Sequence, residues 1–136
     1  MKPMAFVLLT AALAAFVVGC GGPSGPPTGK VSGKVTLDGQ PLADAGIEFL
    51  PDNGRPAAAR TDKDGNYVLQ YSASQAGAGL GMHTVRITTG GERPDPATGQ
   101  FKKYPELVPP QYNVQSTLKK EIKAGENKID FELKSK

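Results

Sequence analysis

Residues 31–51 read VSGKVTLDGQPLADAGIEFLP, and this stretch decides the fold. Apolar and polar residues alternate over 31–37, which is the period of a strand that buries one face. Asp38-Gly39 then indicates a turn. A second alternation follows over 45–49, and Pro51 ends it. The stretch therefore predicts two strands joined by a turn.

The rest of the chain continues this pattern. Short alternating segments are separated by Gly, Pro, Asn and Asp, and no segment after residue 20 carries a helical period. About seven short strands with turn signals between them predict an all-β, antiparallel β-sandwich. The expected strands are 31–37, 45–49, 57–61, 67–71, 83–88, 118–122 and 129–133. The expected core consists of Val31, Val35, Leu37, Ile47, Phe49, Tyr67, Leu69, Val85, Ile87, Ile122, Ile129, Phe131 and Leu133.

Two segments interrupt the strand pattern. Ser72 to Gly81 is small and rich in Gly, which predicts a mobile loop. Gly90 to Pro110 shows no alternation and contains several prolines, so we expect a second and longer loop there. Loops of that length inside a compact domain are uncommon, and they are either functional or disordered. Residues 124–127 (AGEN) are expected to turn the chain before the last strand.

Four motifs occur in order along the domain. They are Gly33-Lys34-Val35, Gly39-Gln40-Pro41-Leu42-Ala43-Asp44-Ala45, Thr61-Asp62-Lys63-Asp64-Gly65-Asn66-Tyr67 and Gly81-Met82-His83-Thr84-Val85-Arg86-Ile87. This order resembles the carboxypeptidase regulatory-like domain, apart from His83, where that family usually has an aromatic residue. The resemblance covers residues 31–133 and implies a transthyretin-like, Ig-like β-sandwich in a domain of residues 31–136. Such a scaffold has many uses, so it implies little about function.

The N-terminal segment has the features of an export signal. Lys2 gives a positive start, and Met4 to Val18 is apolar except for Thr10. This run is shorter than the roughly 20 residues of a helix that spans a bilayer, but it has the length of a secretory signal. Cys20, the only cysteine in the chain, comes shortly after it and cannot form an internal disulfide.

Val17-Val18-Gly19-Cys20 resembles the lipobox of bacterial lipoproteins. The resemblance implies that residues 1–19 are removed as a signal peptide and that the sulfur of Cys20 is thioether-linked to diacylglycerol. Diacylglycerol brings two acyl chains, and in that family the new amine is usually acylated as well; two or three chains give the stable anchoring that one chain does not. We therefore expect an exported protein that is lipid-anchored to the cell envelope.

Residues 20–30 connect that anchor to the domain. They are dominated by Gly and Pro and hold no large apolar side chain, which predicts a tether. Position 21 is Gly. An Asp at this position would resemble the inner-membrane retention signal of lipoproteins from bacteria with two membranes. Its absence favours the outer membrane where the cell has one.

Charge excludes one class of partner. Loss of Lys2 with the signal changes 16 basic residues to 15, against 13 acidic ones, so the mature net charge is +2. This mild excess does not indicate a protein that binds nucleic acid, and export argues further against it. We expect no nucleic-acid partner.

No motif indicates an enzyme, a metal or a cofactor. Asp62-x-Asp64-Gly65 begins like a calcium loop, but no Glu follows at the required place, so we expect a structural hairpin. His83 is the only histidine and has no nucleophile motif beside it, which predicts a rim or core residue. One His and one lipidated Cys cannot form the usual zinc set. Gly77-x-Gly79-x-Gly81 opens no helix and so is not a phosphate loop.

The second long loop carries the candidate binding residues, because it combines aromatic rings with cations. Such a set suits sugar rings or anionic polymers. Alternatively the tyrosines pack on the edge of the sandwich and the loop is simply solvated. The candidates are Arg93, Phe101, Lys102, Lys103, Tyr104 and Tyr112.

Two functions are compatible with these features. The first is a structural or protein-interaction module at the membrane surface, and the second is a module that binds carbohydrate or another envelope polymer. An exposed shelf of aromatic rings on the long loop favours the polymer. Buried tyrosines and a bare sheet edge favour a protein partner, through strand addition.

Overall fold

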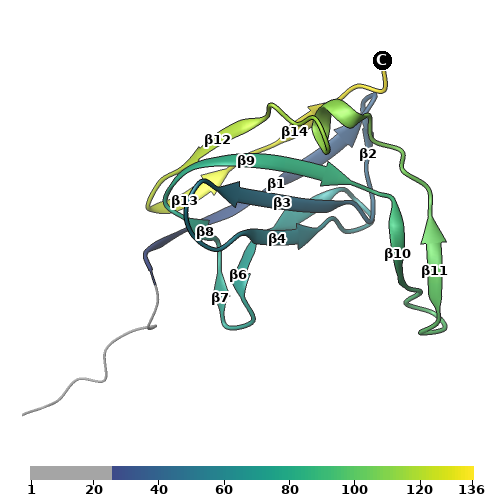
Figure 1. The fold of residues 1–136 in the computed structure, drawn as a ribbon, viewed down its shortest axis with the longest axis horizontal. Helices are drawn as coiled ribbons and strands as arrows, with labels where there is room; N and C mark the ends of the chain where they lie inside the picture. Colours follow the sequence, from purple (N-terminus) through teal and green to yellow (C-terminus); the bar gives the residue numbers. More distant parts are fainter. Residues whose placement is uncertain (1–25) are drawn as a thin grey trace, which may run out of the picture.

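The computed structural model describes residues 26–136, so the predicted signal peptide, Cys20 and most of the predicted tether lie outside the described residues. The all-β class is confirmed: two six-stranded sheets form a sandwich, and a two-stranded ribbon projects from it (Figure 1). Sheet one contains β1 (Thr28–Leu37), β2 (Gln40–Pro41), β5 (Asn66–Val68), β8 (Ala78–Gly79), β13 (Gly125–Lys128) and β14 (Phe131–Leu133). Sheet two contains β3 (Gly46–Pro51), β4 (Ala57–Arg60), β6 (Gln70–Ser72), β7 (Gln75–Ala76), β9 (Gly81–Thr88) and β12 (Lys119–Ile122). The ribbon consists of β10 (Gly91–Pro94) and β11 (Phe101–Tyr104), and a 3-10 helix covers Pro110–Tyr112.

Sheet one is organised around the ten-residue strand β1. Strands β13 and β14 pair along one edge of β1, and β8, β5 and β2 pair along the other. The pairings with β13 and β14 are parallel, whereas every other pairing in residues 26–136 is antiparallel. The predicted antiparallel sandwich is therefore confirmed apart from these two parallel pairings, which were not predicted because alternation along one strand does not reveal the direction of its neighbour.

The expected strand 67–71 is divided between the two sheets at Leu69. Residues up to Val68 pair with β1, and Gln70 pairs with β4 in sheet two. Leu69 is fully buried at this corner, where its N–H donates to the C=O of Val31 at 2.9 Å. Side chains alternate through the corner, so the sequence pattern alone reads as one strand.

Three expected loops or turns are wrong in the same way. Residues 72–81 hold β7, β8 and the ends of β6 and β9 instead of a single mobile loop. Residues 90–110 hold the β10–β11 ribbon, and residues 124–127 lie largely in β13. These strands were missed because they are short and contain Gly or Pro, so none shows an alternating pattern. The described residues thus form fourteen strands instead of about seven.

The predicted core is confirmed, with Leu37 and Ile129 packed at its margin as partly buried residues. Phe131 contacts two other aromatic rings of the core, with its ring centroid 6.2 Å from that of Phe49 and 6.3 Å from that of Tyr67. The Tyr67 hydroxyl donates to the C=O of Ile129, and burial, with a smaller contribution from the Asp130 charge, raises the Tyr67 pKa. Further buried residues that the sequence did not reveal are Leu42, Ala45, Ala57, Ala78 and Val108.

The sandwich has two distinct ends (Figure 1). At the end where the chain enters, Thr28 pairs with Gly79 and β9 begins. At the other end, β1 ends at Leu37, and β9 ends where Thr88 pairs with Gly46. Because strand residues rise about 3.3 Å each, the two ends are separated by roughly the length of β1. We call them the entry end and the ribbon end.

Candidate functional site

The candidate site is the β10–β11 ribbon, which leaves the sandwich at the ribbon end and extends beyond it (Figure 1). Arg93 lies opposite Lys102, and Glu92 lies opposite Lys103. Since side chains alternate across a strand, Arg93, Lys102 and Tyr104 share one face of the ribbon. Glu92, Lys103 and Phe101 share the other.

Arg93 joins the ribbon to the sandwich. Its guanidinium forms an ion pair with Asp44, and its Nη1 donates to the C=O of Thr89 at 3.0 Å. The guanidinium carbon also lies 3.6 Å from the centroid of the Tyr104 ring. Asp44 in turn accepts from Arg60, 3.4 Å away. These contacts hold Arg93 in place, and they leave its side chain only 17% exposed.

A second group, Thr89 and Glu106, closes the base of the ribbon. The Glu106 carboxylate accepts the backbone N–H groups of Thr89, Val108 and Gly90 at 2.9, 3.0 and 3.2 Å. The Thr89 hydroxyl oxygen accepts the Leu107 N–H at 2.7 Å. Partial burial raises the pKa of Glu106, but the backbone N–H donors together outweigh it and hold that pKa below its usual value.

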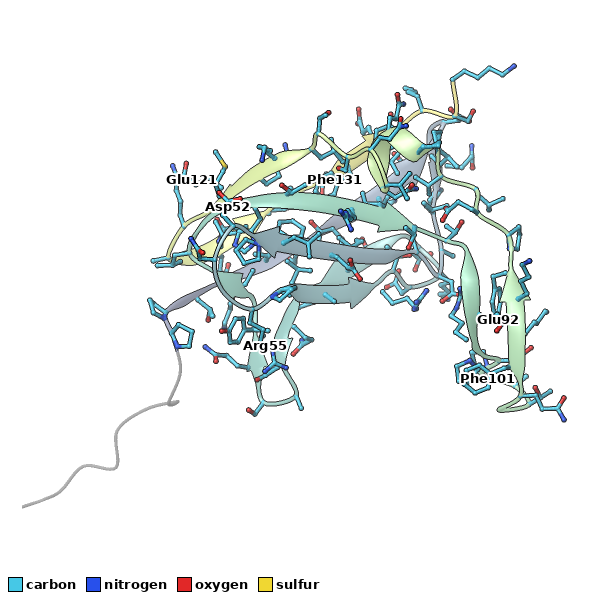
Figure 2. The ribbon with its side chains drawn as sticks, viewed as in Figure 1. Asp52, Arg55, Glu92, Phe101, Glu121 and Phe131 are labelled. Atoms are coloured by element: carbon cyan, nitrogen blue, oxygen red, sulfur yellow. The ribbon has the colours of Figure 1, made fainter. Side chains whose placement is uncertain are left out.

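The far part of the ribbon is open to solvent. Phe101 is 75% exposed, the largest exposure among the large aromatic side chains of residues 26–136, and Figure 2 shows it near the tip. Lys102 and Lys103 are exposed beside it. Lys102 approaches the Asp95 carboxylate at 3.9 Å and the Tyr104 ring at 5.5 Å. The far part therefore presents the Phe101 ring with Lys103 on one face of the ribbon and Lys102 on the other.

The outer edges of the ribbon carry backbone groups that no strand of residues 26–136 pairs. The N–H of Asp95 donates to the C=O of Gln100 at 2.8 Å, which fixes the alternation of inward and outward groups. By that alternation, Phe101 and Lys103 direct their backbone N–H and C=O groups outward from β11. Such an edge is a template for another strand.

The edge of β10 is less suited to pairing. Pro94 lies opposite Phe101, at an outward position, and it has no N–H to donate. Glu92 is then the one outward donor in β10. The ribbon therefore has one open edge, along β11, and one edge that proline interrupts.

The six candidate residues do not form one site. Phe101, Lys102 and Lys103 lie together on the far part of the ribbon, while Arg93 and Tyr104 stack at its base. Tyr112 lies in the 3-10 helix beside the C-terminal segment, where its hydroxyl accepts the Lys134 N–H at 3.1 Å. Thr89 and Glu106 are the residues that sequence reasoning missed, because their roles depend on backbone groups brought together by folding.

The Asp62 to Gly65 turn forms the structural hairpin that we expected. The Asp62 carboxylate accepts the N–H groups of Asp64 and Asn66, each at 2.9 Å. His83 is buried, and its Nε2 lies 2.6 Å from the carbonyl oxygen of Gly79. Within residues 26–136 no three His, Cys, Asp or Glu side chains are grouped to hold a metal. The same range contains no helix with the length and hydropathy needed to cross a bilayer.

No protein-family model and no curated protein matches the chain. A solved structure of a DUF3823 family protein from Parabacteroides merdae is similar to it, with a TM-score of 0.41 and 18% identity. The match covers 80% of this chain but 47% of that one, so the chain spans less than half the length of its neighbour. The likeness is too weak to carry an inference about function. The resemblance to the carboxypeptidase regulatory-like domain remains a prediction.

Proposed function

We propose that this protein is a non-enzymatic, lipid-anchored module of the cell envelope that binds a partner protein by strand addition to β11. The anchor is Cys20, with residues 1–19 removed. The protein is exported, and the outer membrane is the favoured location where the cell has one. The observation that carries the proposal is the open edge of β11 on a ribbon at the far end of the domain.

The side chains of the ribbon favour a protein partner over a sugar. A polymer site needs an exposed shelf of aromatic rings, but Tyr104 is stacked under Arg93 and Tyr112 is bonded at the C-terminal segment. Among the aromatic side chains of residues 26–136, Phe101 alone is mostly exposed. A bare edge with one anchoring ring fits strand addition, in which main-chain hydrogen bonds give affinity and side-chain pockets give specificity.

A second candidate function, the binding of an anionic envelope polysaccharide, is supported by the cations at the tip. Lys103 shares a face of the ribbon with Phe101, and this pair can contact a sugar face and its acidic groups, while Lys102 lies on the other face. This mode depends on side chains, whereas strand addition depends on the backbone N–H of the edge. The two functions can therefore be separated by mutation.

The test compares Lys103→Pro with Lys103→Ala. The proline removes the outward N–H of β11, and the alanine removes only the charged side chain. A photo-crosslinking amino acid at Thr98, in the turn of the ribbon, is activated in intact cells, and the attached proteins are identified by mass spectrometry. We expect Lys103→Pro to abolish the crosslink to a discrete protein and Lys103→Ala to retain it.

The polysaccharide function gives a different pattern. If it holds, both variants and Phe101→Ala lose binding to isolated envelope polysaccharide to a similar degree, and no discrete protein is crosslinked. Equal crosslinking by both Lys103 variants would contradict strand addition at this edge. The melting temperature serves as the folding control, since the ribbon lies outside the core.

A further inference from the structure

The entry end carries an apolar groove that the proposed function does not use. This groove has a volume of about 220 Å³ and is open to solvent. Its apolar lining comes from three separate parts of the chain: the first described residues, the end of β3, and the β6–β9 region. The lining residues are Pro26, Pro27, Pro51, Asn53, Gly54, Arg55, Tyr71, Gly79 and Leu80.

The groove contains the residue types found at membrane interfaces. Leu80, which lines the groove, is 42% exposed; Met82 does not line it but lies at the same end, near the start of β9, and is 53% exposed. Tyr71 is half-buried in the groove, and the guanidinium carbon of Arg55 lies 5.7 Å from the centroid of its ring. An aromatic ring with a polar tip and an arginine beside apolar side chains suit the boundary between acyl chains and headgroups.

The length of the chain that precedes the groove identifies what covers it. From Cys20 to Pro26 there are six residue steps, and each step spans at most about 3.6 Å. A lipidated Cys20 therefore keeps Pro26, and the groove that it lines, within roughly 20 Å of the acyl chains. The ribbon, by contrast, lies at the other end of β1 (Figure 1).

We infer that the entry end rests on the membrane surface, with the groove lined by Tyr71 and Leu80 against the acyl-chain and headgroup boundary. This inference depends on the lipid anchor of the proposed function. Asp52 and Arg55, in the same loop, are exposed and of opposite charge. Contact is therefore driven by apolar burial and does not require anionic lipid.

This orientation has a consequence for the ribbon. If the groove faces the bilayer, the domain stands on its entry end and the open edge of β11 points away from the membrane. A short tether and a lipid contact together restrict how the domain can tilt. The module then presents its binding edge at a fixed height, as a rigid spacer does.

The experiment uses the lipidated protein, in which the Cys20 sulfur is already in a thioether, so an introduced cysteine is the one free thiol. Leu80→Cys and Met82→Cys each carry a fluorophore at the entry end. Val68→Cys, on the outer side of sheet one and 57% exposed, and Phe101→Cys, on the ribbon, are matched controls. Each protein is reconstituted in phosphatidylcholine vesicles that contain a lipid with a quencher on its acyl chain.

We expect stronger quenching at positions 80 and 82 than at positions 68 and 101. Equal quenching at 68 and 80 would overturn the inference, because the domain would then have no preferred face. An unquenched label at 80 that is also shielded from iodide would show a covering protein, such as a second copy, and overturn it too. Protein that fails to float with the vesicles would instead overturn the lipid anchor itself.

Discussion

Gly65 shows how a single residue fixes the turn that precedes β5 against β1 and β2. Its φ is +80°, a region that other residues rarely adopt. A Cβ at this position would lie 2.5 Å from the carbonyl oxygen of Val35 and 3.2 Å from the Leu42 nitrogen. The Gly65 C=O also accepts the Val35 N–H at 2.8 Å, so the backbone cannot move away without losing this bond.

Gly65→Ala is therefore expected to destabilise more than a positive φ alone explains. Gly39→Ala is the matched control, because Gly39 has a φ of +83° and no atom within 4 Å of the added Cβ. We expect the control to lower the free energy of unfolding by about 1–2 kcal/mol, because alanine is strained at a positive φ. Gly65→Ala should cost roughly 1–3 kcal/mol more, from overpacking against backbone. Urea denaturation measures both, and equal losses would contradict the close approach.

For single residues, the sequence predicts a structural role when all the contacts of that residue lie within a few positions of it. The Asp62 to Gly65 turn is predicted correctly because its carboxylate and its glycine act within one motif. Thr61 has a role that no local pattern contains. Its buried hydroxyl donates to the Leu42 C=O at 2.6 Å and accepts the Ala45 N–H at 2.8 Å, across 16 or more residues.

Among the elements, the β10–β11 ribbon depends most on its attachment. A two-stranded ribbon is marginal in water by itself, and this one extends from the sandwich with the Phe101 ring exposed. Its position is therefore set at its base, by Arg93 on one side and Glu106 on the other. The sequence did not predict these strands because a ribbon with no buried face needs no alternation.

Arg93 is expected to act as a positioning residue instead of a ligand contact. Arg93→Lys keeps the charge but loses the planar group that spans Asp44, Thr89 and the Tyr104 ring. We expect the free energy of local opening to fall by about 1–2 kcal/mol, seen as faster amide exchange in β10 and β11. Exchange in β3 and β9 should not change. If the amides of β10 and β11 exchange as slowly in Arg93→Lys as in the parent protein, Arg93 does not hold the ribbon in place.

Glu106 gives the ribbon base a dependence on pH. The pKa of Glu106 is lower in the folded protein than in the unfolded chain, where it is near 4.5. The stability that its carboxylate contributes is therefore fully present above the unfolded pKa and is lost as the pH falls through the folded pKa. Below that range a protonated carboxyl accepts the Thr89, Gly90 and Val108 N–H groups less strongly. We expect these three amide resonances to shift together in an acid titration. Glu106→Gln should abolish the shared transition, and its persistence would assign the transition to another carboxyl.

The whole molecule places its two proposed contacts at opposite ends. The first strand, β1, starts at the tether and ends beside the ribbon end, and it pairs in parallel with the last two strands. The sequence predicted the sandwich and its core, since these follow from alternation. It could not predict the parallel pairing or the distance between tether and ribbon, because both depend on which strands become neighbours.

The anchor determines whether this arrangement has a function, and Cys20→Ser tests it. We expect the variant to remain unprocessed or to become soluble, because serine lacks the sulfur to which the lipid would be attached. Cell fractionation, detergent-phase partitioning and the mass of the N-terminal peptide measure the outcome. The melting temperature of the domain should not change, because position 20 precedes the residues that form the sandwich. If the variant is cleaved normally and still partitions fully with membranes, the anchor lies elsewhere, and the orientation of the ribbon must then be explained by another contact.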